Sequence, residues 1–149
     1  MYKSKYFKPQ ELVSKIVYDK FGENSYQFFD EDVLKELDYI RETYGHPICI
    51  NNWHLYGQYK ESGLRSNRDS LVTSKKTLYL SAHCLGKAFD IKDYNNIKGN
   101  NNRLYNHVLN LMKQGLLKKF RRLENITQTP TWVHIDCFQT KDNKYMVFN

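Results

Sequence analysis

The order of the predicted elements along this 149-residue chain indicates an α+β fold. Helical periodicity dominates the first 45 residues, whereas β-prone segments dominate the rest, with one helical segment inserted among them. Helices followed by strands in this way are typical of the α+β class, in which helices pack against an antiparallel sheet. We therefore expect N-terminal helices packed on a small, mainly antiparallel sheet.

The length and composition predict one globular domain over residues 1–149. A chain of this length can bury a genuine core, and it contains neither internal repeats nor an interdomain linker. Hydrophobic residues make up 40% of the chain, and no run approaches the roughly 20 apolar residues that span a bilayer. A membrane is therefore not an expected partner.

Two helices are predicted near the N-terminus. The first follows Pro9 in FKPQELVSKIVYDKFG, where Leu12, Ile16 and Val17 form an apolar face. The second occupies FFDEDVLKELDYIRETYG, in which Asp30 can cap the helix and acidic residues follow in the first turn. Apolar residues then recur at helical spacing until a glycine ends the segment.

The rest of the chain predicts short strands and one further helix. The strand candidates are residues 46–53, 77–83, 86–92, 118–124, 131–137 and 144–149. The second and third of these are expected to meet at a turn around Gly86, while residues 54–76 are expected to be mostly loop. An Asn-rich stretch leads into the inserted helix, which stops near Gly115. The apolar positions of that helix are Leu104, Val108, Leu111 and Met112.

Charge is distributed unevenly along the chain. Residues 1–45 carry 7 Lys and Arg against 9 Asp and Glu, a net charge of −2. Residues 46–149 carry 16 Lys and Arg against 7 Asp and Glu, a net charge of +9. A positive field attracts anionic partners such as nucleic acid, anionic cell-wall polymer or carboxylate-bearing peptides. No helix-turn-helix, zinc-finger or RNP-like pattern is present, which disfavours nucleic acid as the partner.

The cysteines and the N-terminus predict a cytoplasmic protein as synthesised. Cys49, Cys84 and Cys137 are odd in number and form no C-x-x-C pair, which fits a reducing compartment rather than a disulfide scaffold. The first ten residues, MYKSKYFKPQ, lack the apolar stretch of a signal peptide. Unaided export is therefore not expected.

One histidine and one aspartate, His83 and Asp90, lie seven positions apart in SAHCLGKAFDI, and His134 follows in TWVHID. Two histidines and one carboxylate around an open fourth position form a catalytic zinc site, because water or substrate can enter the open position. Spacing alone leaves two interpretations open, a metal site and a set of unrelated structural residues.

The motifs around these residues resemble the zinc D-Ala-D-Ala carboxypeptidase and peptidoglycan endopeptidase family, which shares its fold with the Hedgehog signalling domain. The family pattern S-x-H-x-x-G-x-A-x-D-I, followed later by W-x-H, is matched by SAHCLGKAFDI and WVH. Three further segments occur in the family's order, and the resemblance covers roughly residues 7–137. These segments are F-x-x-x-E-L at 7–12, L-x-x-L-x-x-I-R-x-x-Y-G-x-P-I at 34–48 and SGLRS at 62–66.

The resemblance implies a zinc cofactor held by His83, Asp90 and His134. It also implies that Arg65, in the SGLR segment, contacts a carboxylate or carbonyl of the substrate. A planar guanidinium suits that task because it can donate two parallel hydrogen bonds. The alternative for Arg65 is an ordinary surface arginine.

Two further candidates for substrate contact come from polar and aromatic positions near these motifs. Ser81 can orient a ligand or touch the substrate, and a plain strand serine is the alternative. Trp132 is a candidate for lining a groove for sugar or peptide, together with Trp53, Tyr56 and Tyr59. Because aromatic residues are 15% of the chain, core packing is the alternative for most of them.

The general base departs from the family pattern. Relatives place a glutamate three or, in the Hedgehog-like branch, six positions before the last histidine, and here those positions are Thr131 and Gln128. The available carboxylates are Glu124, on a neighbouring predicted strand, and Asp136, on the same strand face as His134. We expect Glu124 to act as the base and Asp136 to brace the histidine. Asp136 as the base and the absence of any base are the alternatives.

The resemblance implies zinc-dependent hydrolysis of a peptide bond in bacterial peptidoglycan, by a carboxypeptidase or an endopeptidase. A bacteriophage lysis protein, or a virion-associated protein that contacts other virion proteins, suits the small size and the Lys/Asn/Tyr-rich composition. Two alternatives remain. One is a non-catalytic module of the same zinc fold with a structural or wall-binding role, and the other is a basic nucleic-acid-binding protein.

Overall fold

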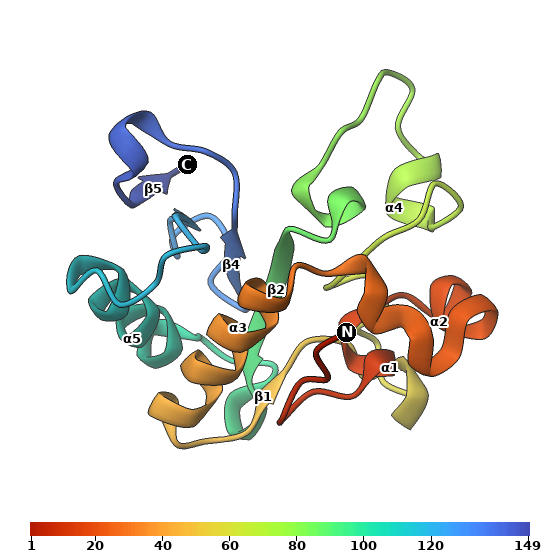
Figure 1. Cartoon of the computed structure of the whole chain (residues 1–149), viewed down its shortest axis with the longest axis horizontal. Coiled ribbons are helices and arrows are strands. Elements are labelled where there is room, and N and C mark those ends of the chain that lie inside the picture. Colours follow the sequence, from red (N-terminus) through yellow and green to blue (C-terminus); the bar gives the residue numbers. More distant parts are fainter.

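Five short strands form one sheet in the order β1-β2-β4-β3-β5 in the computed structural model, which describes residues 1–149 (Figure 1). Neighbouring strands are antiparallel except β3 and β5, which are parallel. The strands are β1 (Ile48–Cys49), β2 (Ala88–Asp93), β3 (Arg122–Glu124), β4 (Val133–Asp136) and β5 (Met146–Phe148). Together with the helices, this sheet confirms the predicted α+β class.

Five α-helices and five short 3-10 helices surround the sheet. The α-helices are α1 (Pro9–Leu12), α2 (Lys15–Phe21), α3 (Glu31–Tyr44), α4 (Ser70–Thr73) and α5 (Asn102–Lys113). The 3-10 helices are η1 (Gly22–Phe28), η2 (Trp53–Leu55), η3 (Ala82–Leu85), η4 (Tyr94–Asn96) and η5 (Lys141–Asn143). None of the helices is long and apolar enough to cross a membrane.

The long helices α3 and α5 lie where the periodicity predicts them. The Asp30 side chain accepts a hydrogen bond from the Asp32 amide at the start of α3, and Gly45 follows the helix with a left-handed φ of 75°. These are the N-cap and the glycine stop that the sequence indicates. Local signals determine this helix, so its boundaries agree with the prediction.

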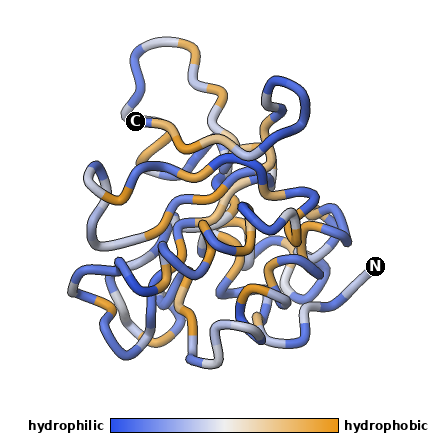
Figure 2. The backbone as a smooth tube through the Cα atoms, turned by 90° about the vertical axis from the view of Figure 1, so that its left-hand side faces the viewer, coloured by the Kyte–Doolittle hydropathy of each residue, from blue (hydrophilic) through white to orange (hydrophobic).

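One hydrophobic core joins the helices to one face of the sheet. It contains 26 buried residues, drawn from α1, α2, α3, α5, η1, four of the strands and the loops between them. In Figure 2, hydrophobic stretches run through the centre of the chain trace, and many peripheral loops are hydrophilic. Phe89 on β2 and Ile135 on β4 are register partners within this core. Because strand side chains alternate, Asp90 and His134 lie on the opposite face.

The single helix predicted after Pro9 is divided into α1 and α2. Val13 lies between them and forms a β-bridge with Leu64, while the buried Ser14 hydroxyl donates to Asp69 Oδ2 at 2.7 Å. These long-range contacts compete with local helix formation and interrupt it. They also draw the segment that contains Arg65 against the N-terminal helices.

The prediction of a strand over residues 77–83 is wrong. Residues 77–81 belong to the open arch that follows α4 (Figure 1), and Leu78 and Leu80 are 87% and 67% exposed. Ser81 then caps η3 by accepting a hydrogen bond from the His83 amide. The segment has a β-prone composition, but no neighbouring strand pairs with it. The expected turn does occur at Gly86, which has a φ of 66°.

Candidate metal centre

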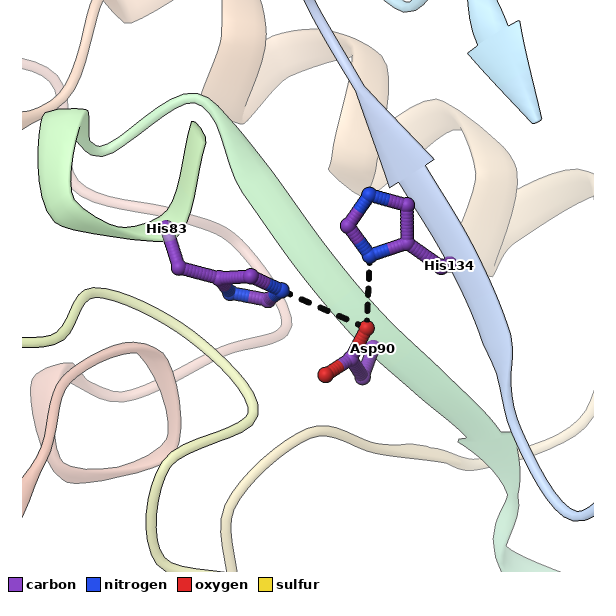
Figure 3. A group of neighbouring side chains, drawn as sticks. All are labelled: His83, Asp90 and His134. Atoms are coloured by element: carbon purple, nitrogen blue, oxygen red, sulfur yellow. Dashed lines mark hydrogen bonds and ion pairs between the residues drawn. The ribbon is translucent and has the colours of Figure 1, made fainter. Parts of the chain in front are cut away.

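Three segments of the chain converge on the polar face of the sheet. Asp90 on β2 and His134 on β4 are direct register partners. His83 comes from η3, the short helix that ends at Gly86 just before β2. Figure 3 shows both imidazole rings directed at the carboxylate of Asp90.

The ligand atoms of this triad are close enough to share one ion. His134 Nδ1 is 2.8 Å and His83 Nε2 is 3.4 Å from the same oxygen, Asp90 Oδ1 (Figure 3). The three potential ligand atoms all lie within 4.8 Å of one another. Two imidazole nitrogens and one carboxylate oxygen are a donor set that zinc accepts. The triad therefore fits the metal that the motifs imply.

The other nitrogen of each histidine has a partner that suits metal ligation. His83 Nδ1 is 2.8 Å from the carbonyl oxygen of Gly63, which can only accept, so Nδ1 carries a proton and Nε2 is directed at Asp90. His134 Nε2 is 3.2 Å from Asp136 Oδ2, while its Nδ1 is directed at Asp90. Such partners orient metal-binding histidines and select the nitrogen that binds.

Burial and charge act in opposite directions at the triad. Burial opposes ionisation of Asp90, but attraction and hydrogen bonds from His83 and His134 lower the pKa of this carboxyl far below its usual range. Burial also disfavours a charged His134, but hydrogen bonds with Asp136 and Asp90 outweigh it and raise the pKa of the imidazole to about 9. At pH 7 without metal, His134 is therefore protonated on both nitrogens.

Zinc binding should release a proton, because the metal must displace the one on His134 Nδ1. Below a pKa of about 9 the histidine is protonated, so raising the pH removes the competing proton and strengthens binding. We expect release of about one proton per zinc at pH 7 and a gain of about tenfold in affinity per pH unit, which levels off near pH 9. Calorimetry in buffers of different ionisation enthalpy measures this proton. A zinc affinity that is constant between pH 6 and pH 8 would contradict the assignment.

Arg65 lies beside the triad and contacts it directly. Its side chain is 9% exposed, and Nη2 is 3.3 Å from Asp90 Oδ2. Its Nε donates to the Glu61 carbonyl at 2.6 Å, and Nη1 donates to the Tyr79 hydroxyl at 3.3 Å. Arg65, Asp90 and Trp132 line one pocket of about 480 Å³. Three of the five guanidinium N–H groups are thus used, and two remain for a ligand in this pocket.

We expect Arg65→Lys to lower turnover of peptide substrate while the protein keeps one zinc. Lysine preserves the charge, but one ammonium group cannot reproduce the separate contacts of the planar guanidinium. The expected loss in kcat/KM is roughly 10- to 100-fold, the scale of one lost charge-assisted hydrogen bond of about 1.5–3 kcal/mol. Kinetics and metal analysis on the same preparation test this. Equal kcat/KM for the two proteins would remove Arg65 from substrate binding.

A second pocket, of about 300 Å³, brings the remaining site candidates together. Ser81, Glu124, His134 and Asp136 all line it. Glu124 ends β3, the strand next to β4, and no hydrogen bond or ion pair engages its carboxylate. Asp136 is 1% exposed and is engaged with His134 and Arg122. The uncommitted carboxylate in this pocket is therefore that of Glu124.

The two positions at which the family that the motifs resemble carries its glutamate lie away from the triad. Gln128 is exposed, and Thr131 is half-buried with its carbonyl accepting from the Asn101 side chain. Neither residue lines the pockets around the triad. A base at those positions is absent from this chain, so the role would fall to Glu124.

The aromatic candidates separate into two groups. Trp132 and Tyr59 line the larger pocket next to Asp90. Trp53 instead packs against Tyr18 and donates its indole N–H to the Val13 carbonyl, and Tyr56 is fully exposed. A groove of four aromatic side chains is therefore not formed, and Trp132 and Tyr59 remain the aromatic candidates beside the triad.

Lys92 is a site neighbour that the sequence does not single out. It is 1% exposed, and its Nζ donates to the Asp90 carbonyl, the Ser62 hydroxyl and the Ile50 carbonyl at 2.8, 3.0 and 3.1 Å. Burial lowers its pKa to about 8. The lysine thus ties the strand of Asp90 to the segment that carries Arg65. Its position two residues after Asp90, on the same strand face, is the signal that could have found it.

Comparison of the chain with protein-family models, curated proteins and solved structures finds no match. The resemblance to the peptidoglycan peptidases therefore rests on the sequence motifs around Arg65, His83, Asp90 and His134 alone. In the fold these four residues lie together.

Proposed function

We propose that this protein is a zinc-dependent peptidase that hydrolyses a peptide bond in the stem or cross-link peptides of bacterial peptidoglycan. The observation that carries the proposal is a possible metal triad with an uncommitted carboxylate, Glu124, in the pocket that His134 lines. A metal site alone would suit a structural role equally well. A free carboxylate in an adjoining pocket is what acid–base chemistry requires.

The residues of the site have separable roles in this reaction. His83, Asp90 and His134 would hold the zinc, which would supply polarisation of the scissile carbonyl and a lowered pKa of the attacking water. Glu124 takes a proton from that water and returns it to the leaving amine. Arg65 offers its two remaining N–H groups to a carbonyl or carboxylate of the substrate in the larger pocket.

The proposed substrate class follows from the motifs and from charge. The resemblance around the triad points to peptidoglycan peptides, which carry carboxylates, and the net +9 of residues 46–149 favours association with them. A bacteriophage lysis or virion-associated protein is the setting that such a substrate suggests.

One observation favours a second function, a non-catalytic module that binds cell wall or other virion proteins. Thr131 and Gln128 occupy the two positions at which relatives carry the base. If Glu124 does not act in their place, the same centre would bind zinc without hydrolysis.

A zymogram on purified peptidoglycan, with and without a zinc chelator, tests these functions. We expect clearing by the zinc-loaded protein, loss of clearing with the chelator and recovery on addition of zinc. Zinc-loaded protein that binds peptidoglycan without cleaving it would favour the non-catalytic module. Absence of both binding and cleavage would contradict the peptidase and the wall-binding module. It would leave a module that binds virion proteins and the nucleic-acid alternative, which a DNA- and RNA-binding assay tests.

A further inference from the structure

A buried carboxylate links β3 to the metal centre. Arg122 on β3 is the register partner of Asp136 on β4. Its Nε is 3.1 Å from Asp136 Oδ1 and 3.2 Å from Oδ2. Asp136 is 1% exposed, and a carboxylate so far from water requires a cation or several hydrogen bonds. Arg122 supplies the cation.

The same carboxylate reaches the triad through its second oxygen. Asp136 Oδ1 accepts a hydrogen bond from the Phe138 amide at 3.0 Å, and Oδ2 lies 3.2 Å from His134 Nε2. Together with Arg122, these contacts give both carboxylate oxygens a partner and fix the orientation of the carboxylate. A continuous chain of contacts therefore runs from Arg122 through Asp136 to His134, whose Nδ1 is directed at Asp90.

The guanidinium of Arg122 is itself held between two aromatic rings. Its central carbon is 4.3 Å from the ring centroid of Phe148 and 5.4 Å from that of Phe138. Parallel pairing of β3 with β5 brings Phe148 to this place, and its ring also meets His134 edge-on, with centroids 6.0 Å apart. Aromatic rings on a guanidinium stabilise its charge and restrict its rotamers.

We infer that Arg122 is a positioning residue of the metal centre. It holds Asp136 in place, and Asp136 in turn orients the imidazole of His134 so that Nδ1 is presented to the metal. Phe138 and Phe148 keep the guanidinium in the position that this requires. The inference rests on the metal site of the proposed function and is independent of peptide hydrolysis.

A double-mutant cycle on zinc affinity tests this role. Arg122→Gln, Asp136→Asn and the variant with both changes are titrated with zinc in competition with a chromophoric chelator. Each single change should weaken zinc binding by about 10- to 100-fold, the usual effect of removing a partner of a metal-binding histidine. Because Arg122 acts through Asp136, the double variant should bind zinc no more weakly than Asp136→Asn alone.

Two further variants separate positioning from a general effect on the fold. Arg121→Gln is the matched control, since the side chain of this neighbouring arginine bonds the carbonyls of Lys118 and Asn143. Its hydrogen bond to the Asp136 carbonyl comes from the backbone amide, which the substitution keeps. It should leave zinc affinity unchanged. Arg122→Lys keeps a cation near Asp136 and should recover part of the affinity lost in Arg122→Gln, which tests the role even if the glutamine variant folds poorly.

Two results would overturn the inference. The first is an unchanged zinc affinity in folded Arg122→Gln, and the second is a loss in the double variant equal to the product of the two single losses. A wild-type protein that binds no zinc would overturn the metal centre and this inference together. Failure to cleave peptidoglycan by a zinc-loaded protein would instead count only against the peptidase function.

Discussion

Replacing His83 and His134 together with alanine should reduce zinc content from about one ion per chain to none and abolish peptidoglycan cleavage. The change removes both nitrogen donors of the triad and leaves a single carboxylate, Asp90, which cannot retain zinc against dilution. Arg65 still pairs with Asp90 in this variant, so the remaining carboxylate keeps a cation beside it. Metal analysis of purified protein, together with the zymogram, measures both effects.

The control for this double variant is a histidine outside the triad. His107 on α5 contacts the Thr43 hydroxyl at 2.9 Å and packs against Tyr44. His107→Ala should keep its zinc and its activity. Stoichiometric zinc that persists in the double variant would place the metal elsewhere in the protein.

Glu124→Gln should keep zinc and lose activity by a factor on the order of 10² to 10⁴, the usual scale for removal of a general base. The amide has nearly the shape of the carboxylate but cannot accept the proton of the attacking water. Because the Glu124 carboxylate makes no hydrogen bond or ion pair and the strand backbone is unchanged, the substitution should change the free energy of unfolding little. Rates of peptide release, measured at equal zinc occupancy, test this prediction.

The opposite pattern is expected for Asp136→Asn, the other carboxylate of the same pocket. Zinc affinity should fall by about 10- to 100-fold, whereas excess zinc should restore most of the cleavage. Full activity in Glu124→Gln would show that Glu124 is not the base. If zinc-loaded wild-type protein cleaves no peptidoglycan, the non-catalytic module becomes the better account of this chain.

The sequence predicted correctly those helices and strands that residues close together in the chain determine. The cap at Asp30 and the glycine at position 45 delimit α3 as the sequence predicts, because capping depends on residues within one turn of the helix. Alternation along β2 and β4 likewise places Asp90 and His134 opposite the hydrophobic face. The prediction failed at residues 77–83, where β-prone composition exists without a partner strand. A strand forms only where a neighbouring strand can pair with it, and amino-acid composition does not show whether such a partner exists.

For the site, the amino-acid sequence by itself determined which side chains could bind a metal and that Asp136 lies on the same strand face as His134. Only the tertiary structure decided the partners of these side chains. The Gly63 carbonyl contacts His83 Nδ1, Lys92 donates to the Asp90 carbonyl, and Arg122 pairs with Asp136. It also decided that Glu124 lines the pocket of His134. These contacts join residues far apart along the chain or on different strands. They follow from strand order and register, which depend on the packing of the whole core rather than on any local pattern.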